Sequence, residues 1–279
     1  MPGEDYREAS LRIWEEMAAG WEGDRQSVWD DSRRVGEWLV DALAPQPGET
    51  VMELAAGVGD TGLAASQRLG PEGKLISTDF SQPMVDAAQR RAGELGVSFA
   101  EFRTLDAERM DLDDASIDGV LCRWGYMLMA DPAAALAETR RVLDDGGRVA
   151  FSVWGDPEQN PWASIPARVL LKHRGAAPPD PYSPGIFAMA SEARTRELLA
   201  GAGLEPSRME NVEMAWRFDS LDAYWHFVTD LAGAVAMSVR ALPEEDQSAV
   251  RDEVERRVEP YAEGAGYRLP GICLNVLAA

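Results

Sequence analysis

The sequence predicts an α/β fold in which helices cover a doubly wound, mostly parallel sheet of seven strands. From residue 48 onward, short runs rich in Val, Ile and Leu alternate with helix-like stretches. Strands separated by helices pair in parallel through right-handed crossovers. The 279 residues are 46% hydrophobic and 27% charged, which is an ordinary globular composition and enough chain to bury one full core.

The first 47 residues are expected to form a helical cap that precedes any strand. Four of the nine tryptophans fall in this stretch, at Trp14, Trp21, Trp29 and Trp38. We expect them to pack the cap onto the body, and some of them to line a pocket.

Residues 48–155 are predicted to form the ligand-binding core. The strands expected in it are 50–55, 74–79, 97–103, 117–122 and 148–154. Helices are expected at 61–69, 83–95 and 132–143, the second capped by Ser81 with a proline in its first turn. The third should end at the acidic glycine turn 144–147.

Residues 156–279 are predicted to form a substrate-side segment within the same structural domain. Its expected order is a proline-rich stretch with a short helix at 163–172, a helix at 191–202 and a strand at 207–218, then helical stretches at 221–242 and 243–262 and a last strand at 272–277. Because the helical pair stands between the last two strands, we expect it to be a lid over the edge of the sheet.

Charge and composition exclude several classes of function. Asp and Glu outnumber Lys and Arg 48 to 27, for a net charge of −21, whereas a nucleic-acid binder needs a basic surface. No apolar run approaches the roughly 18 residues of a membrane span. The acidic start MPGEDYREAS does not resemble a signal peptide, so we expect a cytoplasmic protein. Cys122 and Cys273 lie too far apart for a CxxC metal site, and we expect two buried thiols and no metal.

The most informative motif is a glycine turn that follows the first predicted strand. Gly57, Gly59 and Gly62 spell G-x-G-x-x-G at the start of a helix, where backbone amides can approach a nucleotide. Asp79 ends the second strand, where a carboxylate can accept hydrogen bonds from ribose hydroxyls. Glu53, four residues before Gly57, would repel a pyrophosphate and suits a ligand that carries an ammonium and a sulfonium.

Together these motifs resemble those of the Rossmann-like class I S-adenosylmethionine-dependent methyltransferases. The resemblance rests on E-x-A-x-G-x-G at 53–59, on Asp79, on Leu-Asp-Ala at 105–107 and on Leu-Asp-Asp-Gly-Gly-Arg at 143–148. It covers residues 48–155 and is greatest for the ubiquinone/menaquinone-biosynthesis branch and its small-molecule relatives.

The resemblance implies a set of roles around S-adenosylmethionine, with S-adenosylhomocysteine as the product. Glu53 and the backbone from Ala55 through Gly57 to Gly59 would hold the methionine part, and Asp79 the ribose. The remaining implied contacts are the adenine neighbours Phe80, Met84, Asp106 and Ala107, and the methionine-side and substrate-facing pair Arg123 and Trp124. Ala55 departs from the glycine of many members, which we expect to be tolerated if its φ is negative.

The implied acceptor is a small, apolar or aromatic molecule methylated on oxygen, nitrogen or carbon. Its pocket is expected to draw on aromatic and methionine side chains, namely Trp21, Tyr126, Met127, Phe187 and Trp225. Candidate general bases are His226, His173 and Tyr126, although an ordinary polar role is the better interpretation of both histidines, so the base stays unassigned.

Three alternatives remain open from the residues. Phe80 and Met84 could be core residues and Asp106 a loop cap. The glycine turn also suits a NAD(P)-dependent oxidoreductase, and the chain could be a non-catalytic S-adenosylmethionine-binding protein. We expect a monomer or a homodimer.

Overall fold

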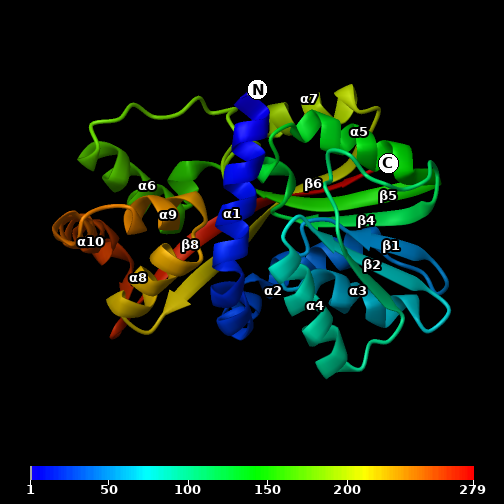
Figure 1. Cartoon of the computed structure of the whole chain (residues 1–279), viewed down its shortest axis with the longest axis horizontal. Helices are drawn as coiled ribbons and strands as arrows, with labels where there is room; N and C mark the ends of the chain where they lie inside the picture. The colour runs from blue at the N-terminus through cyan, green and yellow to red at the C-terminus, as the bar shows by residue number, and fades with distance from the viewer. Residues whose placement is uncertain (1) are drawn as a thin grey trace.

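The computed structural model describes residues 2–279, with side chains from residue 5 on, and it shows an α/β protein built on one sheet (Figure 1). The strand order is β3-β2-β1-β4-β5-β8-β6. The strands from β3 to β5 are parallel, and β8 lies antiparallel between β5 and β6. The predicted doubly wound, mostly parallel sheet is confirmed. An eighth strand of two residues, β7 (Ala262–Glu263), pairs with β8 and was not expected.

The core region follows the predicted alternation with small shifts of boundaries. Its elements are β1 (Thr50–Glu53), α3 (Asp60–Leu69), β2 (Lys74–Asp79), α4 (Gln82–Leu95), β3 (Ala100–Thr104), β4 (Ile117–Arg123), η1 (Tyr126–Leu128), α5 (Pro132–Val142) and β5 (Leu143–Trp154). The Ser81 hydroxyl accepts from the Met84 N–H at the start of α4, as a helix cap should. The predicted start of β5 at residue 148 is wrong, because Leu143 already pairs with Ile117 and the acidic glycine turn forms an irregularity inside the strand.

Two helices, α1 (Pro2–Gly23) and α2 (Arg25–Leu43), form the N-terminal cap. In Figure 1, α1 stands between the sheet and a separate group of helices. Val35, Leu39 and Leu43 of α2 are fully buried. Because they recur at helical spacing, they form one apolar face, and that face packs on the sheet.

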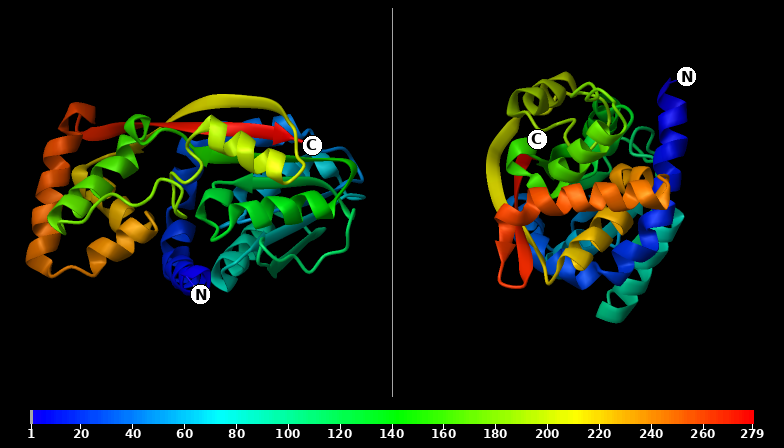
Figure 2. Two further views of the ribbon diagram at one scale, coloured as in Figure 1. Left: turned by 90° about the horizontal axis from the view of Figure 1, so that it is seen from above. Right: turned by 90° about the vertical axis from the view of Figure 1, so that its left-hand side faces the viewer.

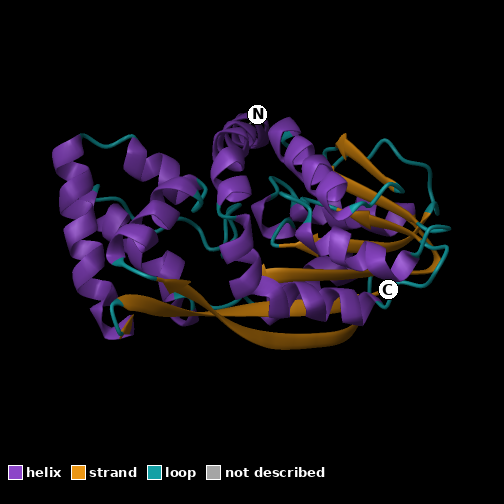
Figure 3. Ribbon diagram, turned by 90° about the horizontal axis from the view of Figure 1, so that it is seen from below, coloured by secondary structure: helices purple, strands orange, loops and turns teal. Residues whose placement is uncertain are grey.

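The C-terminal segment combines two long strands with a group of helices. Its elements are η2 (Pro157–Gln159), α6 (Pro161–His173), α7 (Glu192–Gly201), β6 (Pro206–Phe218), α8 (Leu221–Asp230), α9 (Ala234–Arg240), α10 (Glu244–Val258), η3 (Glu259–Tyr261) and β8 (Gly266–Ala278). Figures 2 and 3 show β6 and β8 running out of the sheet toward the group formed by α6, α8, α9 and α10. The expected continuous helix 221–242 is wrong, because Gly233, with φ 55° and ψ −123°, separates α8 from α9. β8 also begins at Gly266, earlier than the predicted residue 272.

The turn after β1 contains a non-glycine residue in the left-handed region. Ala55 has φ 49°, so the expectation that it tolerates alanine through a negative φ is wrong. An alanine in this region costs about 1–2 kcal/mol, partly offset by its lower unfolded-state entropy. We therefore expect Ala55→Gly to raise the free energy of unfolding by about 0.5–1 kcal/mol, measured by urea unfolding. Ala56→Gly in the same turn is the control, and an equal gain there would contradict this explanation.

Candidate functional site

The carboxyl ends of β1, β2 and β4 meet at the turn that follows β1. Ala55, Gly57 and Gly59 all have positive φ, which folds residues 54–59 into a tight loop before α3. The Leu54 N–H donates to the Leu121 carbonyl of β4, and the Ala56 N–H to the Thr78 carbonyl of β2. The loop is therefore held by backbone hydrogen bonds to both neighbouring strands.

Asp79, at the end of β2, holds this loop. Its carboxylate accepts from the Gly57 N–H at 2.8 Å and from the Ser81 N–H at 2.9 Å, and the residue is 8% exposed. Burial raises the pKa of Asp79, although hydrogen bonds from the backbone N–H groups of Ser81, Gly57 and Phe80 oppose that shift. Each carboxylate oxygen has a second lone pair, so both can still accept from a ligand hydroxyl.

Glu53 lies beneath the loop and is buried. One carboxyl oxygen accepts from the Gly62 N–H at 2.8 Å, and the other is 3.3 Å from the Ser77 hydroxyl. Burial raises the pKa of Glu53 to about 8, while the Gly62 hydrogen bond and the charge of Arg123 lower it. A Cβ on Gly62 would clash with the buried Glu53 carboxyl, which favours glycine at this position.

Arg123, at the end of β4, connects the cap to this site. Its Nε donates to the Thr61 hydroxyl at 3.0 Å and one terminal nitrogen to the Ser32 hydroxyl at 2.9 Å. Its guanidinium lies 4.7 Å from the Trp124 ring centroid and 5.8 Å from that of Trp29. Sequence reasoning missed these partners, because Ser32 comes from α2, far away in the chain.

The expected adenine neighbours adjoin the cap. Met84 is 2% exposed and clusters with Val58 of the loop, while the half-buried Trp14 and Trp21 of α1 pack against this cluster. The Trp21 indole N–H also donates to the Leu231 carbonyl after α8 at 3.2 Å. Phe80 is half-buried. The cap helix α1 therefore covers the loop and contacts the helical group at the same time.

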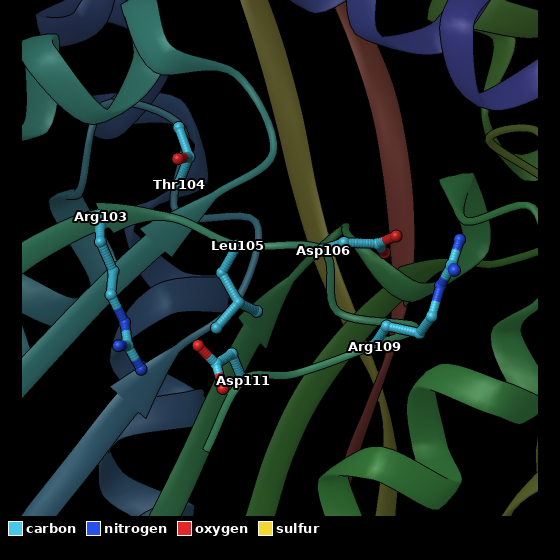
Figure 4. Close-up of a pocket in the computed structure, with 6 residues that line it drawn as sticks. All are labelled: Arg103, Thr104, Leu105, Asp106, Arg109 and Asp111. Atoms are coloured by element: carbon cyan, nitrogen blue, oxygen red, sulfur yellow. The ribbon is translucent and has the colours of Figure 1, made fainter.

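The loop after β3 carries the Leu-Asp-Ala motif. The Asp106 carboxylate accepts from the Glu108 N–H at 2.9 Å and lies 3.9 Å from the Arg7 Nε of α1. Ala107 is buried. A cavity of about 220 Å³ opens here, and Figure 4 shows Asp106 and Arg109 extending to the same side of it. Asp106 caps its own loop, and it still faces a cavity.

The five expected pocket residues do not share one cavity wall. Tyr126 and Met127 are buried in the main core, where the Tyr126 hydroxyl bonds to Thr139 at 2.6 Å. Burial raises the pKa of Tyr126 well above its usual value, which argues against a role as a general base. Trp21, Phe187 and Trp225 are partly buried against the same core. Trp21 lies on α1, Phe187 in the loop before α7, and Trp225 on α8.

Both histidines lie on the surface in contact with carboxylates. His226 is 2.9 Å from Asp24 and 3.2 Å from Asp230, and His173 is 3.3 Å from Asp246. Because these contacts account for both rings, we expect His226→Ala to change methyl transfer by no more than about twofold, as for an ordinary surface substitution. Initial rates measured beside His173→Ala test this, and a loss above tenfold for either variant would identify a base.

One polar atom beside the loop remains without a partner. Asp60 opens α3 directly after Gly59, and its Oδ2 is buried with no hydrogen-bond donor among the described residues. A cationic ligand group at this turn would find an acceptor there. The Asp60 and Asp79 carboxylates as acceptors, together with the loop amides as donors, therefore fit a ligand that combines an ammonium with a ribose.

Among residues 2–279, no group of three or more His, Cys, Asp or Glu side chains is arranged to hold a metal ion. The described helices include none that is long and apolar enough to cross a membrane. Cys122 and Cys273 are buried free thiols, as expected.

Comparisons with known proteins agree with this geometry. Residues 51–147 match the family described as a methyltransferase domain. A demethylmenaquinone methyltransferase from Deinococcus radiodurans is 34% identical over 134 residues, which covers 48% of this chain and 54% of the relative. The chain spans about half the length of the curated relatives it matches.

Solved structures share the fold at low identity. A candidate methyltransferase from Bacillus halodurans superposes with a TM-score of 0.60 at 17% identity and covers 87% of this chain and 97% of that one. A geranyl diphosphate methyltransferase in complex with S-adenosylmethionine superposes with a TM-score of 0.51 at 19% identity, over 87% of this chain and 83% of that one.

Proposed function

We propose that the chain transfers a methyl group from S-adenosylmethionine to a small, apolar or aromatic acceptor, because residues 51–147 match the family described as a methyltransferase domain. The observation that carries the proposal is the β1 turn with Asp79. A carboxylate already bonded to the Gly57 N–H stands where a ribose would lie above the loop. The relatives methylate small molecules by name, as in the demethylmenaquinone and geranyl diphosphate enzymes.

In this proposal, the residues around the turn bind different parts of S-adenosylmethionine. Asp79 accepts from the ribose hydroxyls, Asp60 and the loop amides face the methionine end, and Met84 and Asp106 flank the adenine. Glu53 supports the loop through Gly62, and the charge of Arg123 lowers the pKa of both Glu53 and Asp60. The sulfonium supplies an activated methyl group, so the remaining task of the chain is to align the acceptor and exclude water.

We also propose that three segments of the chain have different roles. Residues 1–47 cap the donor site, 48–155 bind the donor, and 156–279 supply the acceptor side with α8 to α10 as a lid. The contact of Trp21 with both the Met84 cluster and Leu231 supports this view. The net charge of −21 supports a small molecule over nucleic acid, and we propose a cytoplasmic monomer or homodimer.

Thermal unfolding in the presence of different ligands tests whether S-adenosylmethionine is the methyl donor. We expect S-adenosylhomocysteine at about 100 times its Kd to stabilise the native chain by about 2.7 kcal/mol. NAD(P)H should give no shift. Stabilisation by NAD(P)H alone would point to an oxidoreductase, and bound S-adenosylmethionine without turnover on a panel of quinols and phenols would point to a binding protein.

A further inference from the structure

A second cavity lies away from the glycine turn, where the start of α2, the end of β6 and α8 meet. Its volume is about 340 Å³. The lining side chains come from these three segments, and they include Trp216, Phe218, Asp219 and Phe227. None of the residues proposed to bind S-adenosylmethionine lines this cavity, so it has to be explained separately.

One wall of this cavity is aromatic and contains an unsatisfied donor. Trp216 is 2% exposed and Phe227 6%, and their ring centroids lie 4.9 Å apart, with Phe218 beside Phe227 at 5.4 Å. The Trp216 Nε1 is buried and has no acceptor among the described residues. A buried N–H without a partner destabilises the folded chain, so a ligand that brings an acceptor to it gains affinity.

The rest of the lining is strongly acidic. Four aspartates contribute to it against a single guanidinium, that of Arg217. Asp31, with a side chain only 8% exposed, accepts from the Arg217 backbone N–H and side chain. Asp24 is bonded to His226 and Asp30 to Arg33. Asp219 has no cationic partner within the described part of the chain.

We propose that this cavity binds an arylalkylamine, a molecule in which an alkyl chain joins a protonated amine to a flat ring that carries a hydrogen-bond acceptor. The carboxylates exclude an anion, and aromatic faces beside carboxylates are the environment that attracts an ammonium group. The ring packs against Phe227 and Phe218, the acceptor receives the Trp216 N–H, and the ammonium lies toward Asp219. Binding in this cavity does not depend on methyl transfer, because the residues proposed to hold S-adenosylmethionine do not line it.

Tyramine is the probe, because it combines a phenol oxygen with a primary ammonium. Its matched analogues are 3-(4-hydroxyphenyl)propionate, which reverses the charge, and 2-phenylethylamine, which lacks the oxygen. The readout is the indole N–H region of a ¹H–¹⁵N correlation spectrum, where Trp216→Phe identifies one of the signals of the nine tryptophans. We expect tyramine to shift the Trp216 signal most, 2-phenylethylamine to shift it less, and the propionate to leave it unchanged.

Calorimetric titration of variants tests the charge requirement without disturbing the core. Asp219→Asn should weaken tyramine binding about two- to fivefold, the effect of losing one exposed charge. Asp252→Asn, an exposed α10 carboxylate outside the cavity, removes the same charge and should leave the Kd unchanged. Equal binding of tyramine and the propionate, equal weakening by both variants, or no saturable binding of tyramine would each overturn the proposal.

Discussion

Glu53→Gln should be about as stable as the wild-type chain near pH 5 and more stable than it near pH 9. The physical reason is the buried carboxyl, whose pKa rises from 4.5 to about 8 in the folded chain. An acid with a raised folded pKa contributes its full stability below the unfolded pKa and loses it as the pH rises through the folded pKa. Integrated between about pH 5 and pH 9, the loss for the wild type is roughly 4 kcal/mol.

Glutamine resembles the protonated carboxyl and cannot ionise, so the variant should escape that loss. Its carbonyl can accept from the Gly62 N–H, and its amide can donate to the Ser77 hydroxyl. Urea unfolding of both chains across this pH range measures the difference in their free energies of unfolding. Groups that titrate in both chains contribute equally to the two values and cancel. Glu205→Gln removes an exposed carboxylate and is the control. Parallel stability curves for Glu53→Gln and the wild type would mean that Arg123 keeps Glu53 ionised in the native state.

Asp79→Ala should weaken the binding of S-adenosylhomocysteine by about 1–3 kcal/mol, or roughly 5- to 150-fold in Kd. The variant loses the acceptor that we assign to the ribose hydroxyls, and it also frees the Gly57 and Ser81 N–H groups. Isothermal titration gives the affinity, and urea unfolding gives the accompanying loss of stability.

Asp118→Ala separates these two effects. The Asp118 carboxylate accepts from the Thr50 N–H at 2.7 Å, so it also supports β1 through the backbone, but at the strand's opposite end. This variant should lose stability and keep its affinity for the nucleoside. If Asp79→Ala retained wild-type affinity, the ribose assignment would be wrong.

The sequence predicted the sheet well, because its evidence is local. The parallel strands β1, β2, β4 and β5 carry buried apolar residues, and helix caps such as Ser81 mark where the helices begin. The errors lie where non-local contacts decide. Gly233 divides a stretch whose composition is helical throughout, and the pairing of β8 with β6 extends the last strand back to Gly266.

The site was only partly accessible to sequence reasoning, for the same reason. The loop and Asp79 follow from a motif whose parts sit at the ends of adjacent strands. Tyr126 and Met127 follow β4 too, yet η1 turns both into the core. Neither Ser32 nor Trp216 belongs to a sequence motif. Ser32 matters because it accepts a hydrogen bond from Arg123, and Trp216 because it lines a cavity formed by three distant segments.

The position of α2 has a consequence for how the chain folds. This helix packs along the last two long strands, with Asp31 bonded to Arg217, Trp38 to Glu210 and the Val35 carbonyl to Asn275. During synthesis α2 emerges well before β8, because Val35 and Asn275 lie 240 residues apart in the chain. The contacts of α2 with β6 and β8 can therefore form only late in synthesis, and contacts of such long range slow folding. Until β8 is complete, the part of α2 that it covers is where a nascent chain would aggregate or recruit a chaperone.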